Sequence, residues 1–283
     1  GRGRQARIVC ALCDDVGERT CVGCGDCVQA CPTGALIPKT VLNEEGVLAK
    51  TPDRKVDSLC PYCGVGCQLT FNIKNDEIIS VDGREGPANR NRLCVKGRYG
   101  FDYVHNPERL NVPLIRRDDS PKTPDLPNNP LSNFREATWE EALDKAASGL
   151  LKVRNQNGGN ALAGFGSAKG SNEEAYLVQK LVRTGFGTNN VDHCTRLCHA
   201  SSVAALMETI GSGAVTAPFA EAENSEVIIV IGANPTVNHP VAATFIKNAT
   251  KAGSKLIVMD PRGQALSRHA THMIQFKPSS DVA

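Results

Sequence analysis

The sequence predicts an α/β protein with a cysteine-rich N-terminal part, and three observations support this prediction. Ten of the twelve cysteines fall within the first 94 residues, in runs too tight for ordinary disulfide pairing. Beyond residue 133, apolar strands alternate with amphipathic helices, a pattern typical of a parallel sheet. Hydrophobic residues make up 41% of the 283 residues and charged residues 22%, which is the composition of an ordinary soluble globular protein.

Composition also narrows the classes of function. Lys and Arg number 32 against 30 Asp and Glu, so the net charge of +2 gives no support to a nucleic-acid-binding face or a basic membrane patch. No run of eighteen apolar residues occurs, so we expect no membrane span. The N-terminal segment lacks the apolar stretch of a secretory signal, which favours the cytoplasm. Because the chain begins with Gly rather than Met, there is room for an upstream start.

Four segments follow from the distribution of residue types. Residues 1–38 are dense in cysteine, and residues 39–56 are hydrophilic and predict a linker. Residues 57–112 hold a second cysteine group around a predicted hairpin, in which two apolar strands flank a polar turn at residues 74–76. Residues 113–283 form the α/β part.

The α/β part begins with a loop rich in Pro, Asp and Asn at residues 116–133. Thr138 and Ser171 are predicted to cap two helices, since a side-chain oxygen there accepts a hydrogen bond from a free amide of the first turn. Gly253 is predicted to end a third helix. The predicted buried strands are 161–165, 226–232 and 255–260, and the predicted helices begin at Trp139, cover 172–184 and cover 239–253.

The first cysteine run has the spacing Cys-x2-Cys-x2-Cys-x3-Cys-Pro, which is that of a bacterial ferredoxin ligand set for a 4Fe–4S cluster. Gly23 and Gly25 relieve crowding where backbone amides point at sulfur, and a zinc site is the alternative. Cys10 and Cys13 begin a second such run, but Val16 stands in place of its third cysteine. Whether these two are partial ligands or ordinary thiols, and whether the last cysteine of the first run closes its own cluster, therefore stays open. The predicted ligands are Cys21, Cys24, Cys27 and Cys31.

A second set consists of Cys60, Cys63 and Cys67, with Cys94 following after 26 residues. The surrounding sequences, CPYCGVGC and GPANRNRLCVKGRYGFDYVHNPERL, resemble the N-terminal cluster domain of the molybdopterin oxidoreductase superfamily, the dimethyl sulfoxide reductase type. This resemblance implies a 4Fe–4S cluster near a pterin, with Lys96 bridging the two. The alternative for Lys96 is a solvated surface lysine.

The segment NNVDHCTRLCHASSVAAL at 189–206 resembles the part of formate dehydrogenases that supplies the metal ligand. On that match Cys198 would bind molybdenum or tungsten, and His199 would handle the substrate proton. A soft thiolate suits such a metal, and imidazole titrates near neutral pH. Cys194 has no role in the pattern, and we expect it to be a buried structural thiol. The alternative for the motif is a Cys-His pair buried at a helix start.

The loops that follow the strands at 226–232 and 255–260 occupy the edge at which open parallel sheets bind nucleotides. The G-x-G-x-x-G motif of NAD-binding proteins is absent. These loops instead resemble those that hold the two arms of bis-molybdopterin guanine dinucleotide, with simple turn chemistry as the alternative. The positions that the resemblance assigns to the cofactor are Lys169, Gly232, Ala233, Asn234, Asp260, Arg262, Ser279 and Asp281.

The resemblance covers nearly the whole chain and is nearest to the alpha subunit of cytoplasmic, NAD-linked formate dehydrogenases. It implies a ferredoxin-like iron–sulfur segment, a small β-rich 4Fe–4S domain and the start of parallel-sheet α/β molybdopterin-binding domains. It also implies two clusters, a molybdenum or tungsten cofactor, formate as substrate, and separate flavin and iron–sulfur subunits that resemble NADH dehydrogenase. The family continues beyond KPSSDVA, so we expect an incomplete fragment. The alternatives are a nitrate reductase-type molybdoenzyme, a complex I-like electron conduit without the metal cofactor, and a cysteine-rich zinc module.

Overall fold

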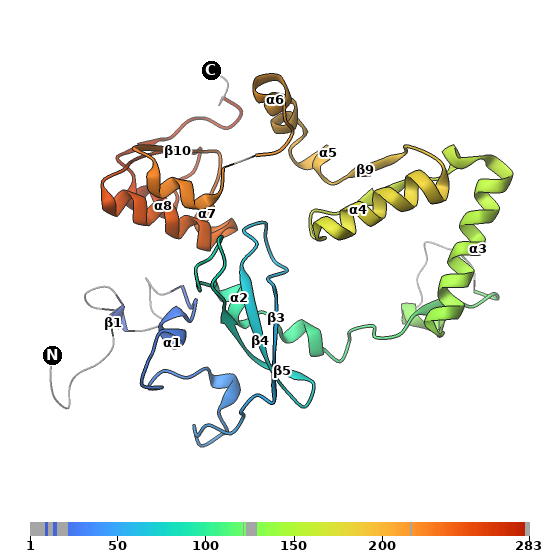
Figure 1. Ribbon diagram of the computed structural model, residues 1–283, viewed down its shortest axis with the longest axis horizontal. Helices are drawn as coiled ribbons and strands as arrows, with labels where there is room; N and C mark the ends of the chain where they lie inside the picture. The colour runs from blue at the N-terminus through green and yellow to red at the C-terminus, as the bar shows by residue number, and fades with distance from the viewer. Residues whose placement is uncertain are drawn as a thin grey trace. The chain divides into compact units, whose positions relative to one another are not determined.

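The computed structural model describes the backbone of residues 9–10, 14–15, 22–120, 122, 129–215 and 217–280, with side chains from residue 22 onward. The chain divides into two units (Figure 1). One unit combines Gly1–Asn106 with Thr216–Ala283, and the other is Pro107–Val215.

The first unit contains an antiparallel sheet in the order β3-β4-β5. β4 (Gln68–Lys74) and β5 (Glu77–Gly83) form the predicted hairpin, which is confirmed. Its turn residues Asn75 and Asp76 both have positive φ, 51° and 63°, the conformation that a two-residue type I′ turn requires. β3 (Arg54–Leu59) pairs along the other side of β4.

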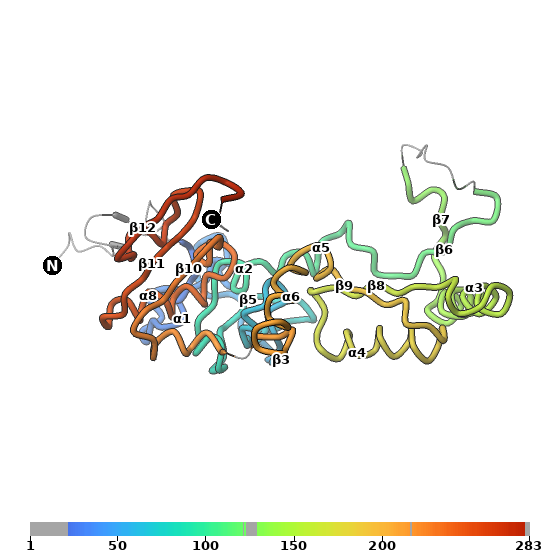
Figure 2. Tube along the Cα trace, turned by 90° about the horizontal axis from the view of Figure 1, so that it is seen from above, coloured from blue at the N-terminus to red at the C-terminus, as the bar shows by residue number. Residues whose placement is uncertain are grey.

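The first unit also contains a parallel sheet in the order β10-β11-β12 (Figure 2). β10 (Val227–Ile231) and β11 (Lys255–Met259) pair in parallel, and α8 (Pro240–Ala252) connects them. Gly253, at φ 118°, ends α8 in the left-handed conformation that glycine favours. The predicted strand–helix–strand unit is therefore confirmed. β12 (His272–Ile274) extends the sheet.

Helix α8 joins two hydrophobic cores. Phe245 is fully buried in a core that contains Leu69 of the hairpin and Leu93 before α2. Ile246 packs against the second core, which is built on the parallel sheet around Leu256. Full burial of a Phe side chain contributes about 1.5–3 kcal/mol. α8 therefore ties the hairpin and the parallel sheet into one unit.

One face of β10 is exposed. Val227, Ile229 and Ile231 expose about half of their side chains, 54%, 60% and 49%, whereas Val230 on the other face is buried. Parallel sheets are usually covered on both faces, and in the described chain α8 packs on one. The prediction that this whole apolar run is buried is therefore wrong for the alternate residues.

The second unit begins with two helices whose starts were predicted correctly. α3 (Trp139–Asn157) is capped by the hydroxyl of Thr138, and α4 (Asn172–Lys180) by that of Ser171 in a complete capping box. α4 continues into a π-helical turn over Leu181–Phe186.

The strand predicted at 161–165 is displaced. β8 covers Gly164–Gly166 and pairs in parallel with β9 (Val191–His193). The preceding Gly159–Ala161 close a 3-10 turn, which delays the extended backbone. Phe165 is 80% exposed, so the strand is not buried as predicted.

The remaining elements are short, except for one helix that follows the cysteine–histidine segment. None of the described helices has both the length and the apolar composition that a membrane span requires. Other helices and strands are β1 (Val9–Cys10), β2 (Asp14–Asp15), α1 (Asp26–Gln29), α2 (Val95–Tyr99), β6 (Leu114–Arg116), β7 (Phe134–Glu136), α5 (Thr195–Cys198), α6 (Ala200–Ile210) and α7 (Pro235–Asn238).

Candidate cluster and cofactor sites

The second cysteine set converges on one pocket. Three of its members lie in the loop between β3 and β4, and the fourth precedes α2. The amide of Cys60 donates to the carbonyl of Cys67 across 2.9 Å, which closes the loop. The first residues of α8 also form part of the wall of this pocket. The lining residues are Cys60, Tyr62, Cys63, Val65, Cys67, Leu93, Cys94, Gly97, Pro240 and Val241.

The electrostatics of these thiols suit a cationic iron centre. Burial, together with the neighbouring thiols of the set, raises the pKa of Cys67 to about 12. Burial also raises the pKa of Cys60, with Cys94 and Cys63 adding to the effect. Iron binds thiolates, so a cluster would supply the positive charge that this apolar pocket lacks. The donor set therefore fits a 4Fe–4S cluster.

The described residues suit a cluster better than a single metal ion. Within the described residues, no three His, Cys, Asp or Glu side chains are arranged to hold one metal ion. In a 4Fe–4S cluster each thiolate binds a different iron, so its ligands surround a cube rather than one point.

Helix α2 forms one side of this pocket. Lys96 is exposed on α2, and its charge acts on Cys60 in the direction that lowers the pKa of that thiol. The backbone of Gly97 faces the pocket so closely that a Cβ there would lie 3.4 Å from Cys60 Sγ. Lys96 therefore lies close enough to act on Cys60, and its exposure also agrees with the alternative of a solvated surface lysine.

In the described part of the first cysteine run, Cys24 precedes α1, Cys27 lies within it and Cys31 follows it. Burial raises the pKa of Cys24, and the nearby Cys27 thiol contributes in the same direction. Cys31 has a different environment: the pKa of its thiol is lowered to about 7, first by a hydrogen bond with the Thr33 hydroxyl at 3.5 Å. The side chains of Cys10, Cys13 and Cys21 lie outside the described residues.

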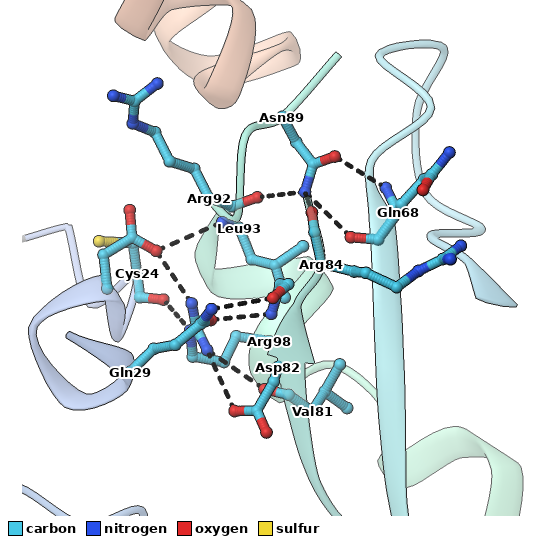
Figure 3. Close-up of polar contacts among 12 residues, drawn as sticks. Cys24, Gln29, Gln68, Val81, Asp82, Arg84, Asn89, Arg92, Leu93 and Arg98 are labelled. Atoms are coloured by element: carbon cyan, nitrogen blue, oxygen red, sulfur yellow. Dashed lines mark hydrogen bonds and ion pairs between the residues drawn. The ribbon is translucent and has the colours of Figure 1, made fainter. Parts of the chain in front are cut away.

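Sequence reasoning missed the side chains that hold these loops in place. Asn89 is fully buried, and its amide nitrogen donates to the carbonyls of Gln68, Arg84 and Arg92 at 2.9, 3.2 and 3.0 Å (Figure 3). Its Oδ1 accepts from the amide of Gln68 at 3.0 Å. Asn89 thus fixes the loop that leads to Cys94. Its spacing gives no signal; only its place in GPANRNRLC could have drawn attention to it.

Cys198 and His199 lie at a break between two helices of the second unit. α5 ends at Cys198, and His199, at φ −147° and ψ 37°, precedes α6. Both side chains are exposed, which disagrees with the alternative of a buried pair. The expectation that Cys194 is a buried thiol is wrong: it is exposed, and its Sγ lies 3.7 Å from His193 Nδ1, because it sits on the short turn that enters α5.

Two further polar side chains of this segment were missed. His193 Nδ1 lies 2.6 Å from the Thr195 hydroxyl at the end of β9. Asp192 accepts from Arg196 at 2.9 Å, and this hydrogen bond lowers the pKa of the Asp192 carboxyl. Both residues line a pocket that also contains Arg183. Both residues lie in the VDHCTR part of the segment at 189–206, so their position in that motif could have identified them.

The loops after β10 and β11 meet at one edge of the parallel sheet. The amide of Gly232 donates to the carbonyl of Met259 at 2.9 Å, and Gln264 Nε2 donates to the carbonyl of Ala233 at 2.9 Å. The structure therefore brings the predicted residues of the first loop next to those of the second.

The second loop is shaped by its own carboxylate. Asp260 is buried, and its Oδ1 accepts from the amide of Arg262 at 2.8 Å while its Oδ2 accepts from Gln264 Nε2 at 3.3 Å. Gln264 Oε1 is buried and has no hydrogen-bond partner among the described residues. Such an unsatisfied acceptor is costly, so it marks an edge that suits a polar ligand. The Arg262 side chain is exposed.

The other predicted cofactor positions are scattered. Asn234 Oδ1 accepts from the Thr236 hydroxyl at 2.6 Å, just beyond the sheet edge. Ser279 is exposed at a positive φ of 64°. Lys169 lies in the loop after β8 of the second unit. Asp281 lies outside the described residues.

Models of three protein families match the chain. The molybdopterin oxidoreductase family matches residues 109–283, and the molybdopterin oxidoreductase Fe4S4 domain matches residues 53–106. A 4Fe-4S binding domain matches residues 15–37. The three matches follow one another along the chain and include both cysteine sets.

Individual proteins are similar over nearly the whole chain. YjgC of Bacillus subtilis, a probable oxidoreductase by name, is 34% identical over 94% of this chain. A Staphylococcus haemolyticus protein with the provisional name formate dehydrogenase is 31% identical over 94%. The chain spans 30% of the length of each. Acetylene hydratase from Pelobacter acetylenicus shares the fold with a TM-score of 0.61 at 20% identity, over 77% of this chain and 29% of that one.

Proposed function

The chain belongs to the molybdopterin oxidoreductase family, and from that premise we propose that it is part of the alpha subunit of a formate dehydrogenase. In this proposal the protein oxidises formate to carbon dioxide in the cytoplasm. The electrons taken from formate pass through two 4Fe–4S clusters to flavin and iron–sulfur subunits that reduce NAD. Because the chain spans 30% of the relatives it matches, the substrate and partners belong to the whole protein.

The observation that carries the proposal is the convergence of Cys60, Cys63, Cys67 and Cys94 on one apolar pocket beside Lys96. When bound, the clusters and the molybdenum or tungsten cofactor supply the one-electron and two-electron redox chemistry. The four thiolates would hold one cluster, and Lys96 would link it to the pterin. Cys24 and Cys27, with Cys21 and Cys31, would hold the other.

The proposed bis-molybdopterin guanine dinucleotide would lie along the parallel sheet edge. Gly232, Ala233 and Asn234 would contact one arm, and Asp260 and Arg262 would contact its base or phosphates. The unsatisfied Oε1 of Gln264 lies at this edge and supports a polar occupant. Further contacts are proposed for Lys169, Ser279 and Asp281.

Formate is favoured over other substrates by Cys198 and His199. A thiolate at the helix break would bind the metal, and the adjacent imidazole would accept the proton that formate loses. The provisional name of the Staphylococcus haemolyticus relative agrees with this choice.

The test replaces one cysteine in the full-length protein. Cys198→Ala is expected to abolish formate oxidation while the spectra of both clusters survive, because the substitution removes the metal ligand and leaves the cluster ligands in place. Cys194→Ala, which removes the other exposed cysteine of this segment, is the matched control and should retain activity.

Two results would contradict the proposal. Formate turnover that persists in Cys198→Ala would remove this residue as the metal ligand. Turnover of nitrate but not of formate by the unaltered protein would assign it to the nitrate reductase type.

A further inference from the structure

We propose that Arg98 is a positioning residue that fixes the first cysteine run against helix α2 and so sets the distance over which the two clusters exchange electrons. The inference rests on the proposed function in one respect, since it takes both cysteine sets as cluster ligands. It assigns a role to a residue that neither ligand set contains.

Arg98 is a buried cation with partners on both sides (Figure 3). Its side chain is 3% exposed. Nε donates to the carbonyl of Cys24 at 2.7 Å, and Nη2 donates to Asp26 Oδ1 at 2.9 Å. Nη1 donates to the carbonyl of Val81 in β5 at 3.2 Å. One guanidinium thus bonds the first cysteine run to the sheet of the cluster domain.

Two more side chains of the run strengthen this attachment. Gln29 donates to the carbonyl of Gly83 and accepts from its amide, both at 2.8 Å, so its side chain pairs with the end of β5 as a strand would. Asp26 Oδ1 also accepts from the amide of Leu93 at 3.3 Å. The run is therefore held at three points, of which Arg98 is the most buried.

The attachment places α2 between the two cysteine sets. Gly97 faces Cys60 Sγ, which a Cβ at this position would contact at 3.4 Å, while its neighbour Arg98 bonds the carbonyl of Cys24. The backbone from Cys94 to Arg98 and one hydrogen bond therefore connect a ligand of one set to a ligand of the other. Electron tunnelling slows steeply with distance, so the separation that this connection fixes would govern the rate of transfer.

The step that Arg98 would govern is the transfer of one electron. The Cys60 set would hold the cluster that gives up this electron, and the first run would hold the cluster that receives it. The proposed flavin and iron–sulfur subunits would supply the final acceptor. No bond is made or broken and no proton moves, so the distance between the clusters is the quantity that this attachment controls.

The experiment uses Arg98→Met and Gln29→Ala in the full-length protein, with Arg54→Met as the matched control. Arg54 pairs with Asp76 at 2.7 Å in the same sheet and is exposed. Iron content, the magnetic interaction between the two reduced clusters, and the hydrogen exchange of the Gly83 amide are measured in each.

The unaltered protein should hold roughly eight iron atoms and show two mutually broadened signals on reduction. Arg98→Met should keep the iron, lose the broadening, and raise the exchange rate of the Gly83 amide at least about tenfold. Loss of the charged hydrogen bonds of Arg98 releases the run that carries Gln29, whose Oε1 accepts from that amide. Gln29→Ala removes the acceptor of the Gly83 amide directly, so its informative readout is the broadening, which should fall by less than in Arg98→Met. Arg54→Met should leave them unchanged.

Unchanged broadening and exchange in a fully loaded Arg98→Met would overturn the positioning role while the clusters themselves stood. If Arg98→Met loses iron, unchanged broadening in a fully loaded Gln29→Ala would overturn the role of this attachment in setting the distance between the clusters. An unaltered protein with roughly four iron atoms would instead refute the two-cluster part of the proposed function, and this inference with it.

Discussion

Gly25 shows how tightly a single residue is fitted between the first cysteine run and α2. Its φ of 72° is one that side chains with a Cβ rarely adopt. A Cβ at this position would also overlap the side chains of Arg98 and Tyr99. We predict that Gly25→Ala lowers the iron content of the first run and leaves the cluster of the Cys60 set intact, because the overlap pushes the run away from α2.

Gly34 provides the control for this prediction. It has nearly the same φ, 69°, but a Cβ there would meet nothing within 4 Å. Gly34→Ala should therefore cost only the backbone strain, about 1 kcal/mol, and retain the iron. The test measures iron per chain and the thermal unfolding midpoint of both variants. Equal iron loss in both would show that the overlap is unimportant.

At the residue scale, sequence predicted which cysteines gather and missed what holds them. Cysteine spacing is a local property, so the pocket of the Cys60 set could be expected from the order of the residues alone. Arg98 bonds residues 17 and 74 positions away along the chain, and Asn89 bonds Gln68, 21 positions away. Residue spacing says nothing about such distant contacts. The environment of Cys194 was mispredicted because the pattern specified the residue and not its exposure.

At the scale of elements, the starts of helices and the hairpin were predictable because their signals are local. A cap needs a hydroxyl and an amide three residues on, and Thr138 and Ser171 supply the hydroxyl. The displacement of β8 and the open face of β10 were not predictable. Both depend on which other parts of the chain cover a strand. The apolar residues of the strand itself carry no information about that cover.

The 3-10 turn Ala265–His269, between β11 and β12, carries a prediction about pH. Burial, followed by the charges of Lys247, Arg268 and Lys251, lowers the pKa of His269 below its ordinary 6.5. As the pH falls, the unfolded chain therefore takes up the proton before the folded chain does. The stability that neutral His269 supports is present above about pH 6.5 and is lost as the pH falls through the lowered pKa.

We therefore expect His269→Gln to reduce the fall in the thermal unfolding midpoint between about pH 7 and pH 5. His272→Gln, in an exposed position of β12, should keep the slope of the unaltered protein. A slope that is the same in all three proteins would show that His269 does not contribute.

At the scale of the whole molecule, the cysteine pocket is built from distant parts of the chain. Pro240 and Val241 line it together with cysteines from residues 60–94, and all of its lining residues belong to the first unit. This wall could not be predicted from residue patterns, because it depends on how α8 packs on the hairpin core. Arg90 reinforces the packing by pairing with Glu223 at 2.8 Å and lying over the Phe245 ring.

Removal of iron should therefore also change the dynamics of α8, which is distant from the cysteines along the chain. We predict that chelation of the clusters increases hydrogen exchange in residues 60–97 and also in the first turns of α8, because the pocket that they share loses its bound group. Exchange in α3, which lies in the other unit, should stay the same. An effect confined to residues 60–97 would show that α8 does not depend on the bound cluster.

The wall that α8 contributes also has a consequence for synthesis. Cys94 precedes Pro240 by 146 residues, so at about 5–20 residues per second the ribosome needs roughly 7–30 seconds to make the segment between them. During that interval the four thiols exist without their last apolar neighbours. We therefore expect oxidants and stray metals to reach them more easily in the nascent chain than in the finished protein.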